Sequence, residues 1–203
     1  MRRTLFAAAV VVWAAAGVIA QDKKDVKAPN LYPLAKGTKW EYEVNANGQK
    51  LEASQEVTDV AEAKEKGKAA IATLSTTVGP QKLTEEMSAD DKGVYRHSMQ
   101  GQKLSTPVTA LKYPVKEGDK WDAKIALAGQ EADATFETKK AEKVKVAAGE
   151  YTATPVEMNI QAMGQTIKAT NWYADGVGII KQEMTLPMGI TVTMELKKFT
   201  AGK

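Results

Sequence analysis

The chain has 203 residues, no cysteine and a single histidine. Because no disulfide can stabilise it, an ordinary hydrophobic core must do so, and the length suffices for one domain or two small ones. With 28 basic and 25 acidic residues, the formal net charge is only +3. Such a balance gives no electrostatic footprint for nucleic acid, and we expect no nucleic-acid partner.

The N-terminal segment, residues 1–20, has the layout of a cleaved export signal. Arg2 and Arg3 precede an apolar run that ends in small and branched residues. The run is shorter than the roughly 20 residues that a helix needs to cross a bilayer. Gln21 stands where a lipoprotein would carry its lipidated cysteine. We therefore expect cleavage before Gln21, no remaining membrane span, and a soluble product in the periplasm or outside the cell.

Beyond the signal, the chain changes from a polar leader to alternating strands. Residues 21–30, QDKKDVKAPN, are expected to form a flexible leader. In the next segment Trp40, Tyr42 and Val44 share one face, and charged residues occupy the other. Asn47-Gly48 follows, which is the strongest hairpin signal in the sequence.

Similar alternation continues to the end of the chain and predicts the fold class. Further strands are expected at residues 51–61, 69–78, 83–88, 94–99, 120–127, 132–146, 151–161, 166–173, 177–184 and 190–199. One-sided alternation is typical of antiparallel sheets with one dry face. The sequence predicts one all-β domain over residues 31–200. It would be an antiparallel meander of about ten strands, curled into a half-barrel or barrel or folded as a two-layer sandwich.

One motif occurs twice. YPLAKGTKWEYEV begins at Tyr32 and YPVKEGDKWDAKI at Tyr113, a separation of 113 − 32 = 81 positions. In each copy proline favours an extended lead-in, glycine allows a turn, and tryptophan is the first inward side chain of a strand. We expect Trp40 and Trp121 to be buried at strand starts. The repetition favours two related β units, starting near residues 32 and 113.

The stretch NWYADGVGIIKQEM at residues 171–184 contains closely spaced glycines but does not match a phosphate loop. A third glycine is missing, β-branched residues follow, and no helix N-terminus is expected. We interpret Asp175 and Gly176 as a tight turn. Gly178, inside the following strand, is expected to mark a bulge or a place where an aromatic ring lies on bare backbone.

Three segments together resemble a known family. They are YPLAKGTKWEYEV, KVKVAAGEYTATPVEM at residues 143–158, and NWYADGVGIIKQEM. In this order they resemble TapB-like exported bacterial β-sheet domains of unknown function. Members of that family show a Pro-Leu-x-x-Gly-x-x-Trp start and a Trp-Tyr-Ala-x-Gly-Val-Gly close. The resemblance implies an antiparallel sheet, which can be curled as in periplasmic lipoprotein carriers, and no known catalytic residues. Many such proteins are lipoproteins, whereas this chain lacks the cysteine.

Catalytic candidates are few. His97 has no accompanying nucleophile motif. Glu85-Glu86 and Asp90-Asp91 are adjacent pairs, and neighbouring strand residues point to opposite faces, so neither pair can flank one bond. We interpret these carboxylates as solvent-facing charge. The sequence therefore predicts a protein that is not an enzyme and uses no cofactor.

Copper binding is an alternative interpretation. His97-Ser98-Met99 places an imidazole and a thioether at alternate positions of one strand, and both ligand types suit copper. Methionine more often fills β cores than binds metal, however, so the main prediction includes no metal site.

The remaining prediction is a structural or binding role. A curled sheet could enclose an apolar small molecule or a lipid chain, which is the only kind of partner that the residues suggest. The candidate binding residues are the large apolar side chains Trp40, Trp121, Trp172, Met158, Met184 and Met194. Packing of the same side chains into a filled core is the favoured interpretation.

Overall fold

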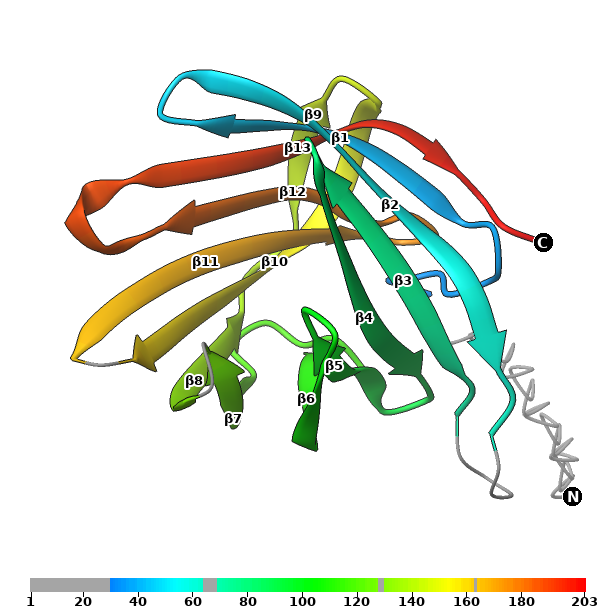
Figure 1. Cartoon of the computed structure of the whole chain (residues 1–203), viewed down its shortest axis with the longest axis horizontal. Helices are drawn as coiled ribbons and strands as arrows, with labels where there is room; N and C mark the ends of the chain where they lie inside the picture. Colours follow the sequence, from blue (N-terminus) through cyan, green and yellow to red (C-terminus); the bar gives the residue numbers. More distant parts are fainter. Residues whose placement is uncertain (1–29, 64–68, 128–129, 163) are drawn as a thin grey trace, which may run out of the picture.

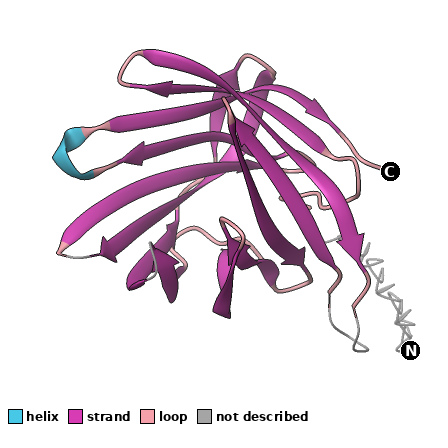
Figure 2. Ribbon diagram, viewed as in Figure 1, coloured by secondary structure: helices cyan, strands magenta, loops and turns pink. Residues whose placement is uncertain are grey.

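A computed structural model describes residues 30–63, 69–127, 130–162 and 164–203. The expected export signal at residues 1–20 and nearly all of the leader at residues 21–30 lie outside the described residues. Strands make up almost all of the regular structure, and a short 3₁₀ turn at Pro187–Gly189 joins the last two of them (Figures 1 and 2).

The described residues form thirteen β-strands. Their bounds are β1 Lys39–Ala46, β2 Gln49–Ala61, β3 Ile71–Val78, β4 Gln81–Ala89, β5 Gly93–Met99, β6 Gln102–Lys112, β7 Lys120–Leu127, β8 Gln130–Thr138, β9 Glu142–Val146, β10 Gly149–Ala162, β11 Gln165–Ala174, β12 Gly178–Thr185 and β13 Thr191–Thr200.

All strands belong to one antiparallel sheet, in the order β6-β5-β4-β3-β2-β1-β13-β12-β11-β10-β8-β7, with β9 paired to β10. The sheet curls so that its two edge strands, β6 and β7, come close together without forming a ladder in the described residues (Figure 1). The Trp121 indole N–H bridges this seam by donating to the Thr109 carbonyl oxygen at 2.8 Å. The result is a nearly closed barrel.

The prediction of an all-β antiparallel fold is confirmed, and the curled form is the one adopted. The structure has more strands than expected. β6 was not predicted because its sequence, QKLSTPVTALK, is mostly polar and contains Pro107, a residue that an edge strand tolerates. The expected strand at residues 132–146 is interrupted, so its two parts form β8 and β9.

In both copies of the repeated motif, the strand that carries the tryptophan pairs with the next strand in the same register. In β1 and β2 the ladder runs from Lys39↔Glu56 to Ala46↔Gln49, and in β7 and β8 from Lys120↔Glu137 to Leu127↔Gln130. Each residue number in the second ladder equals the corresponding number in the first ladder plus 81 (39 + 81 = 120, 56 + 81 = 137).

The lead-in hydrogen bonds repeat as well. Gly37 N–H donates to the Val57 carbonyl at 2.8 Å, and Gly118 N–H donates to the Thr138 carbonyl at 2.8 Å. The motif therefore specifies the same strand start at two places in the sheet.

Trp40 and Trp121 are buried at the second position of β1 and β7, as predicted. Trp40 stacks on Tyr32 with ring centroids 5.5 Å apart, and Trp121 stacks on Phe136 at 5.2 Å. Such aromatic pairs add to the stabilisation from buried area. Both tryptophans belong to one continuous core that extends along the inner face of the sheet.

Candidate functional site

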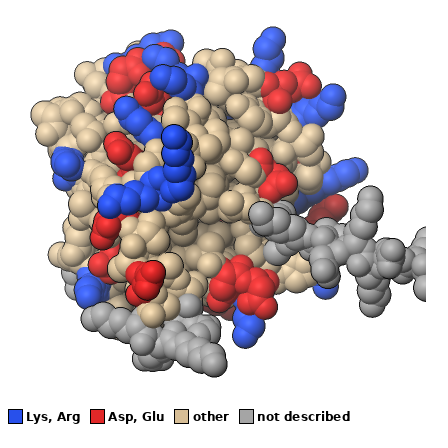
Figure 3. Space-filling view, turned by 90° about the vertical axis from the view of Figure 1, so that its right-hand side faces the viewer, with Lys and Arg blue, Asp and Glu red and all other residues tan. Residues whose placement is uncertain are grey.

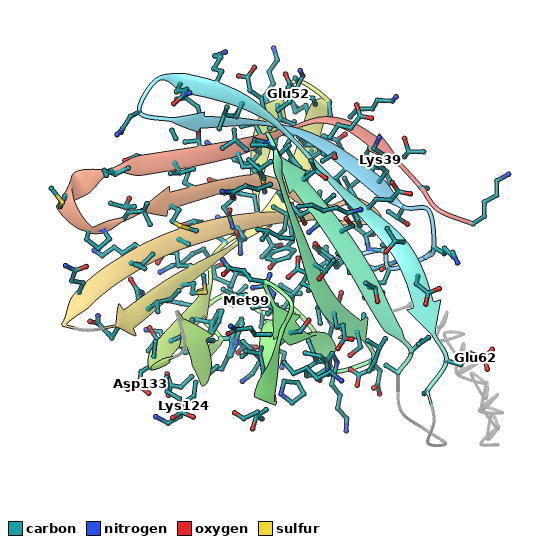
Figure 4. All side chains as sticks on the ribbon, viewed as in Figure 1. Lys39, Glu52, Glu62, Met99, Lys124 and Asp133 are labelled. Atoms are coloured by element: carbon teal, nitrogen blue, oxygen red, sulfur yellow. The ribbon has the colours of Figure 1, made fainter. Side chains whose placement is uncertain are left out.

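The inner face of the curled sheet contains a hollow. A cavity of about 330 Å³ lies against β1 to β5, β12 and β13, partly open to solvent. Its apolar wall includes Tyr42, Val78, Leu83 and Met194. Met99 also lines it, and Figure 4 shows this side chain within the curl of the sheet, whereas Glu52 projects outward from β2.

A polar cluster is set into this apolar wall. The Tyr32 hydroxyl donates to Gln55 Oε1 at 2.8 Å. Gln55 Nε2 in turn donates to Thr76 Oγ1 at 3.1 Å and to Glu85 Oε1 at 2.9 Å. Tyr32, Gln55, Thr76 and Glu85 all line the cavity, and we call these residues, together with Arg96, the polar cluster.

Arg96 and Glu85 form the charged end of the polar cluster. Arg96 Nε lies 2.8 Å from Glu85 Oε2, and the two side chains are only 29% and 16% exposed. The short distance establishes an ion pair, but the Nε–H does not point along it, so this buried donor has no well-aligned acceptor among the described residues. The Glu85 carboxylate raises the pKa of Arg96, and partial burial opposes that rise.

Strand register brings the polar cluster together. Gln55 on β2 lies directly opposite Thr76 on β3. Arg96 on β5 lies opposite Met87 on β4, so that Glu85, two residues from Met87, is its diagonal neighbour on the same face. Diagonal neighbours are within reach of long side chains. The cluster therefore crosses four adjacent strands.

The interpretation of Glu85 as solvent-facing charge is wrong, because its side chain points inward and pairs with Arg96. The alternation of buried and exposed residues along β4 and β5 could have predicted that Glu85 points inward. Glu85 is in phase with the buried Met87, and Arg96 is in phase with the buried Val94. Opposite charges in phase with the apolar faces of consecutive strands predict a buried pair.

Three tyrosines beside the cluster are also buried. Burial raises the pKa of Tyr32 and Tyr42, and it raises that of Tyr173 to about 12. The Tyr42 hydroxyl donates to the Ile179 carbonyl at 2.9 Å. These groups are therefore neutral hydrogen-bond donors at physiological pH.

Of the residues proposed to bind a ligand, the structure places Met194 at the cavity. Trp40 and Trp121 are core residues, and Met158 and Met184 are half-buried and do not line the cavity. Trp172 is also half-buried away from the cavity. Its indole N–H donates to Glu142 Oε1 at 2.7 Å, and Lys181 Nζ lies 5.0 Å from its ring centroid.

The two alternative copper ligands, His97 and Met99, have different surroundings. Met99 lines the cavity, whereas His97 Nε2 lies 2.8 Å from Ser88 Oγ. A register shift between Arg96 and Ser98 interrupts the alternation that the copper interpretation assumed. Among the described residues, no group of three or more His, Cys, Asp or Glu side chains could hold a metal ion.

The glycines of residues 171–184 have the structural roles that the sequence predicted. Gly176 has a φ of 71° in the turn between β11 and β12. Gly178 has a φ of 99°, and a β-carbon added there would lie 3.3 Å from Trp40 Nε1. The Trp40 indole N–H donates to the Val177 carbonyl, and β12 bulges at Ile180, opposite Trp172 and Tyr173 of β11. Aromatic packing on bare backbone and a bulge are therefore both present.

The outer surface carries dispersed charge. Figure 3 shows basic and acidic side chains interspersed over one face of the molecule. Among the described residues, no helix is long and apolar enough to cross a bilayer.

Comparison with known proteins identifies fold and family. A candidate exported protein with a YmcC-like fold from Bacteroides fragilis superposes with a TM-score of 0.56 at 17% identity, covering 83% of this chain and 98% of that one. A candidate lipoprotein from Parabacteroides distasonis gives a TM-score of 0.55 at 16% identity, with 84% and 98% covered. A search of curated proteins gives no significant match. Residues 75–185, more than half of the chain and the part that contains Glu85 and Arg96, match the DUF3108-like family, and the chain therefore belongs to it.

Proposed function

We propose that this protein is an exported, non-catalytic binding protein that holds a small, largely apolar ligand inside its curled sheet. The observation that carries this proposal is the cavity of about 330 Å³ on the inner face. Ligand sites of about 300–1,000 Å³ with apolar walls and a few convergent polar groups are typical of small-molecule binding. The apolar wall and the polar cluster provide both features.

The cavity wall favours an apolar occupant for two reasons. Leu83 lines the cavity yet remains 37% exposed, so that an apolar surface is accessible at its mouth. Met99 and Met194 contribute flexible, polarisable side chains that adapt to ligands of different shape. Displacing water from such surface is favourable by about 25 cal/mol for each Å² buried.

Export is supported independently of the cavity. Residues 1–20 have the layout of a cleaved signal. The two structural neighbours are described as a candidate exported protein and a candidate lipoprotein. The TapB-like resemblance favours the same compartment. Mass spectrometry of the exported product should find Gln21 at its N-terminus, and a product that retains Arg2 and Arg3 would contradict this part of the proposal.

Binding can be tested with the neutral fluorescent probe N-phenyl-1-naphthylamine. Leu83→Trp places a larger side chain in the cavity, whereas Lys82→Trp places the same side chain at the adjacent exposed position of β4. We expect the wild-type protein and Lys82→Trp to bind the probe alike and Leu83→Trp to bind it about tenfold more weakly, a loss of about 1.4 kcal/mol. Equal binding by both variants, or no binding by the wild type, would contradict the proposal.

A further inference from the structure

We propose that the cavity selects a ligand with a single acyl chain, whose carboxylate or ester oxygen accepts hydrogen bonds from Arg96. This assignment rests on the proposed function, and it adds the chemical class of the ligand. It follows from the balance of donors and acceptors in the polar cluster.

The acceptors of the cluster are already engaged. Gln55 Oε1 accepts from Tyr32, and Glu85 Oε1 accepts from Gln55. Glu85 Oε2 is the oxygen that lies 2.8 Å from Arg96 Nε. A ligand group that mainly donates, such as an ammonium, would therefore have to share acceptor oxygens that the protein's own donors already use.

The donors of the cluster, in contrast, exceed its acceptors. A guanidinium carries several N–H groups and accepts none. Arg96 lines the cavity, and its buried Nε lies against Glu85, so the terminal Nη groups are the ones that a ligand can reach. Thr76 Oγ1 accepts from Gln55, which leaves its own proton free to donate. Because donors at a largely buried site are normally paired, a ligand that supplies an acceptor suits these groups.

The charge of the Glu85–Arg96 pair and the volume of the cavity restrict the chemical class of the ligand further. Glu85 balances the charge of Arg96, so an uncharged ester carbonyl suits the site as well as a carboxylate does. Because the pair is neutral overall, the preference for an acceptor rests on the guanidinium donors and not on net charge. A water molecule takes about 30 Å³ of liquid, so 330 Å³ has room for roughly ten such units. That space suits one medium-length acyl chain.

The test displaces N-phenyl-1-naphthylamine with three ligands of equal chain length: decanoate, methyl decanoate and decylamine. We expect the wild-type protein to release the probe at an acyl-ligand concentration about tenfold lower than that of decylamine. Displacement by decanoate alone would indicate a free fatty acid as the ligand. Displacement by both acyl ligands would indicate that esterified acyl chains are accepted as well.

The variant that removes the selective group is Glu85→Gln together with Arg96→Gln, which eliminates both charges and leaves neither one buried alone. Its matched control is Lys124→Gln with Asp133→Gln, an exposed pair on β7 and β8 with an ion-pair distance of 2.9 Å and no part in the cavity (Figure 4). We expect the first double variant to lose the preference for acyl ligands, measured as the ratio of the decylamine concentration to the acyl-ligand concentration that releases the probe. The control should keep that preference.

The outcomes separate the two proposals. If the wild type binds the probe but does not distinguish decanoate or its ester from decylamine, the acyl assignment is overturned and the binding proposal stands. The assignment is equally overturned if the double variant at residues 85 and 96 keeps the wild-type preference. If the wild type does not bind the probe at all, both proposals fail.

Discussion

Arg96 is the only arginine after residue 3, and the other cationic side chains of residues 30–203 are lysines apart from the single histidine. Lysine is a strongly hydrated point charge, whereas arginine is less hydrated and presents a planar set of donors, which suits it to partly buried ion pairs. Among the described residues, lysines form the other ion pairs, each with an acidic partner at least 31% exposed, whereas the partner of Arg96 is only 16% exposed. The use of arginine instead of lysine therefore distinguishes the ion pair of the cavity from the other ion pairs.

The first prediction concerns this ion pair. Arg96→Met leaves the Glu85 carboxylate largely buried without its partner. Breaking a fully buried pair costs about 3–5 kcal/mol. Because the Arg96 side chain is 29% exposed, solvent screening reduces the expected loss to about 1–3 kcal/mol.

Urea denaturation of Arg96→Met, Glu85→Gln and the double variant Glu85→Gln/Arg96→Met measures this loss. The double variant should regain part of the stability that Arg96→Met loses. Strictly additive losses would show that the two side chains do not interact.

The second prediction uses the single histidine. Burial lowers the pKa of His97 below its ordinary value of 6.5. A pKa that is lower in the folded than in the unfolded state contributes stability above pH 6.5 that is lost as the pH falls through the folded-state pKa.

NMR titration of the imidazole protons gives the pKa directly, since only one histidine contributes. We expect a value below 6.5 and a fall in unfolding free energy on acidification that is smaller in His97→Gln. A pKa at or above 6.5 would contradict the burial of this ring against Ser88.

At the scale of elements, the turn between β11 and β12 has the strictest local requirement. Gly176 has a φ of 71°, and a β-carbon added there would meet no atom within 4 Å, so backbone conformation alone restricts this position. Asparagine tolerates this region of backbone space and valine does not. Gly178 is restricted both by its φ of 99° and by the Trp40 ring.

The third prediction follows from these differences. Thermal unfolding should show a small loss of stability for Gly176→Asn and a larger one for Gly176→Val, because only the β-branched residue is strained there. Gly178→Val should be destabilised as well, by contact with Trp40. Equal melting temperatures for Gly176→Asn and Gly176→Val would contradict a left-handed conformation at this position.

Alternation predicted most of the elements, because a half-buried strand repeats every two residues. It missed β6, whose edge position removes the need for a continuous apolar face, and it did not separate β8 from β9. The cavity was harder to predict. Whether Met194 lines a hollow or fills a core depends on the curvature of the whole sheet, which a single strand does not encode.

At the scale of the molecule, the two halves of the chain occupy the sheet in the same manner. β1 to β6 follow one another in order, as do β7 to β13 apart from β9, and β13 pairs with β1. A symmetric arrangement would also pair β6 with β7, the two strands that meet at the seam. We propose on this basis, and on the matching ladders and the matching hydrogen bonds of Gly37 and Gly118, that the domain contains two related units.

The fourth prediction tests these units with a circular permutant that begins at Tyr113 and joins Lys203 to Asn30 through a short Gly/Ser linker. The Lys203 N–H donates to the Lys36 carbonyl at 3.2 Å, so the linker has to span no more than the extended length of residues 30–36, about 20 Å. Opening the chain between Lys112 and Tyr113 breaks no ladder.

We expect this permutant to melt within a few degrees of the wild type. A control permutant opened between Asn47 and Gly48, inside the β1–β2 hairpin, should melt at a lower temperature. Greater stability of the control would contradict the assignment of two units.

The central claim, a ligand held inside the curled sheet, is tested most directly by where a bound ligand perturbs the protein. Methionine methyl groups report on this, because Met99 and Met194 line the cavity whereas Met188 is 97% exposed at the tip between β12 and β13. The naphthyl ring of N-phenyl-1-naphthylamine should shift the methyl resonances of Met99 and Met194 and leave that of Met188 unchanged. A probe that shifts Met188 and leaves Met99 and Met194 unchanged would bind outside the sheet and contradict the account.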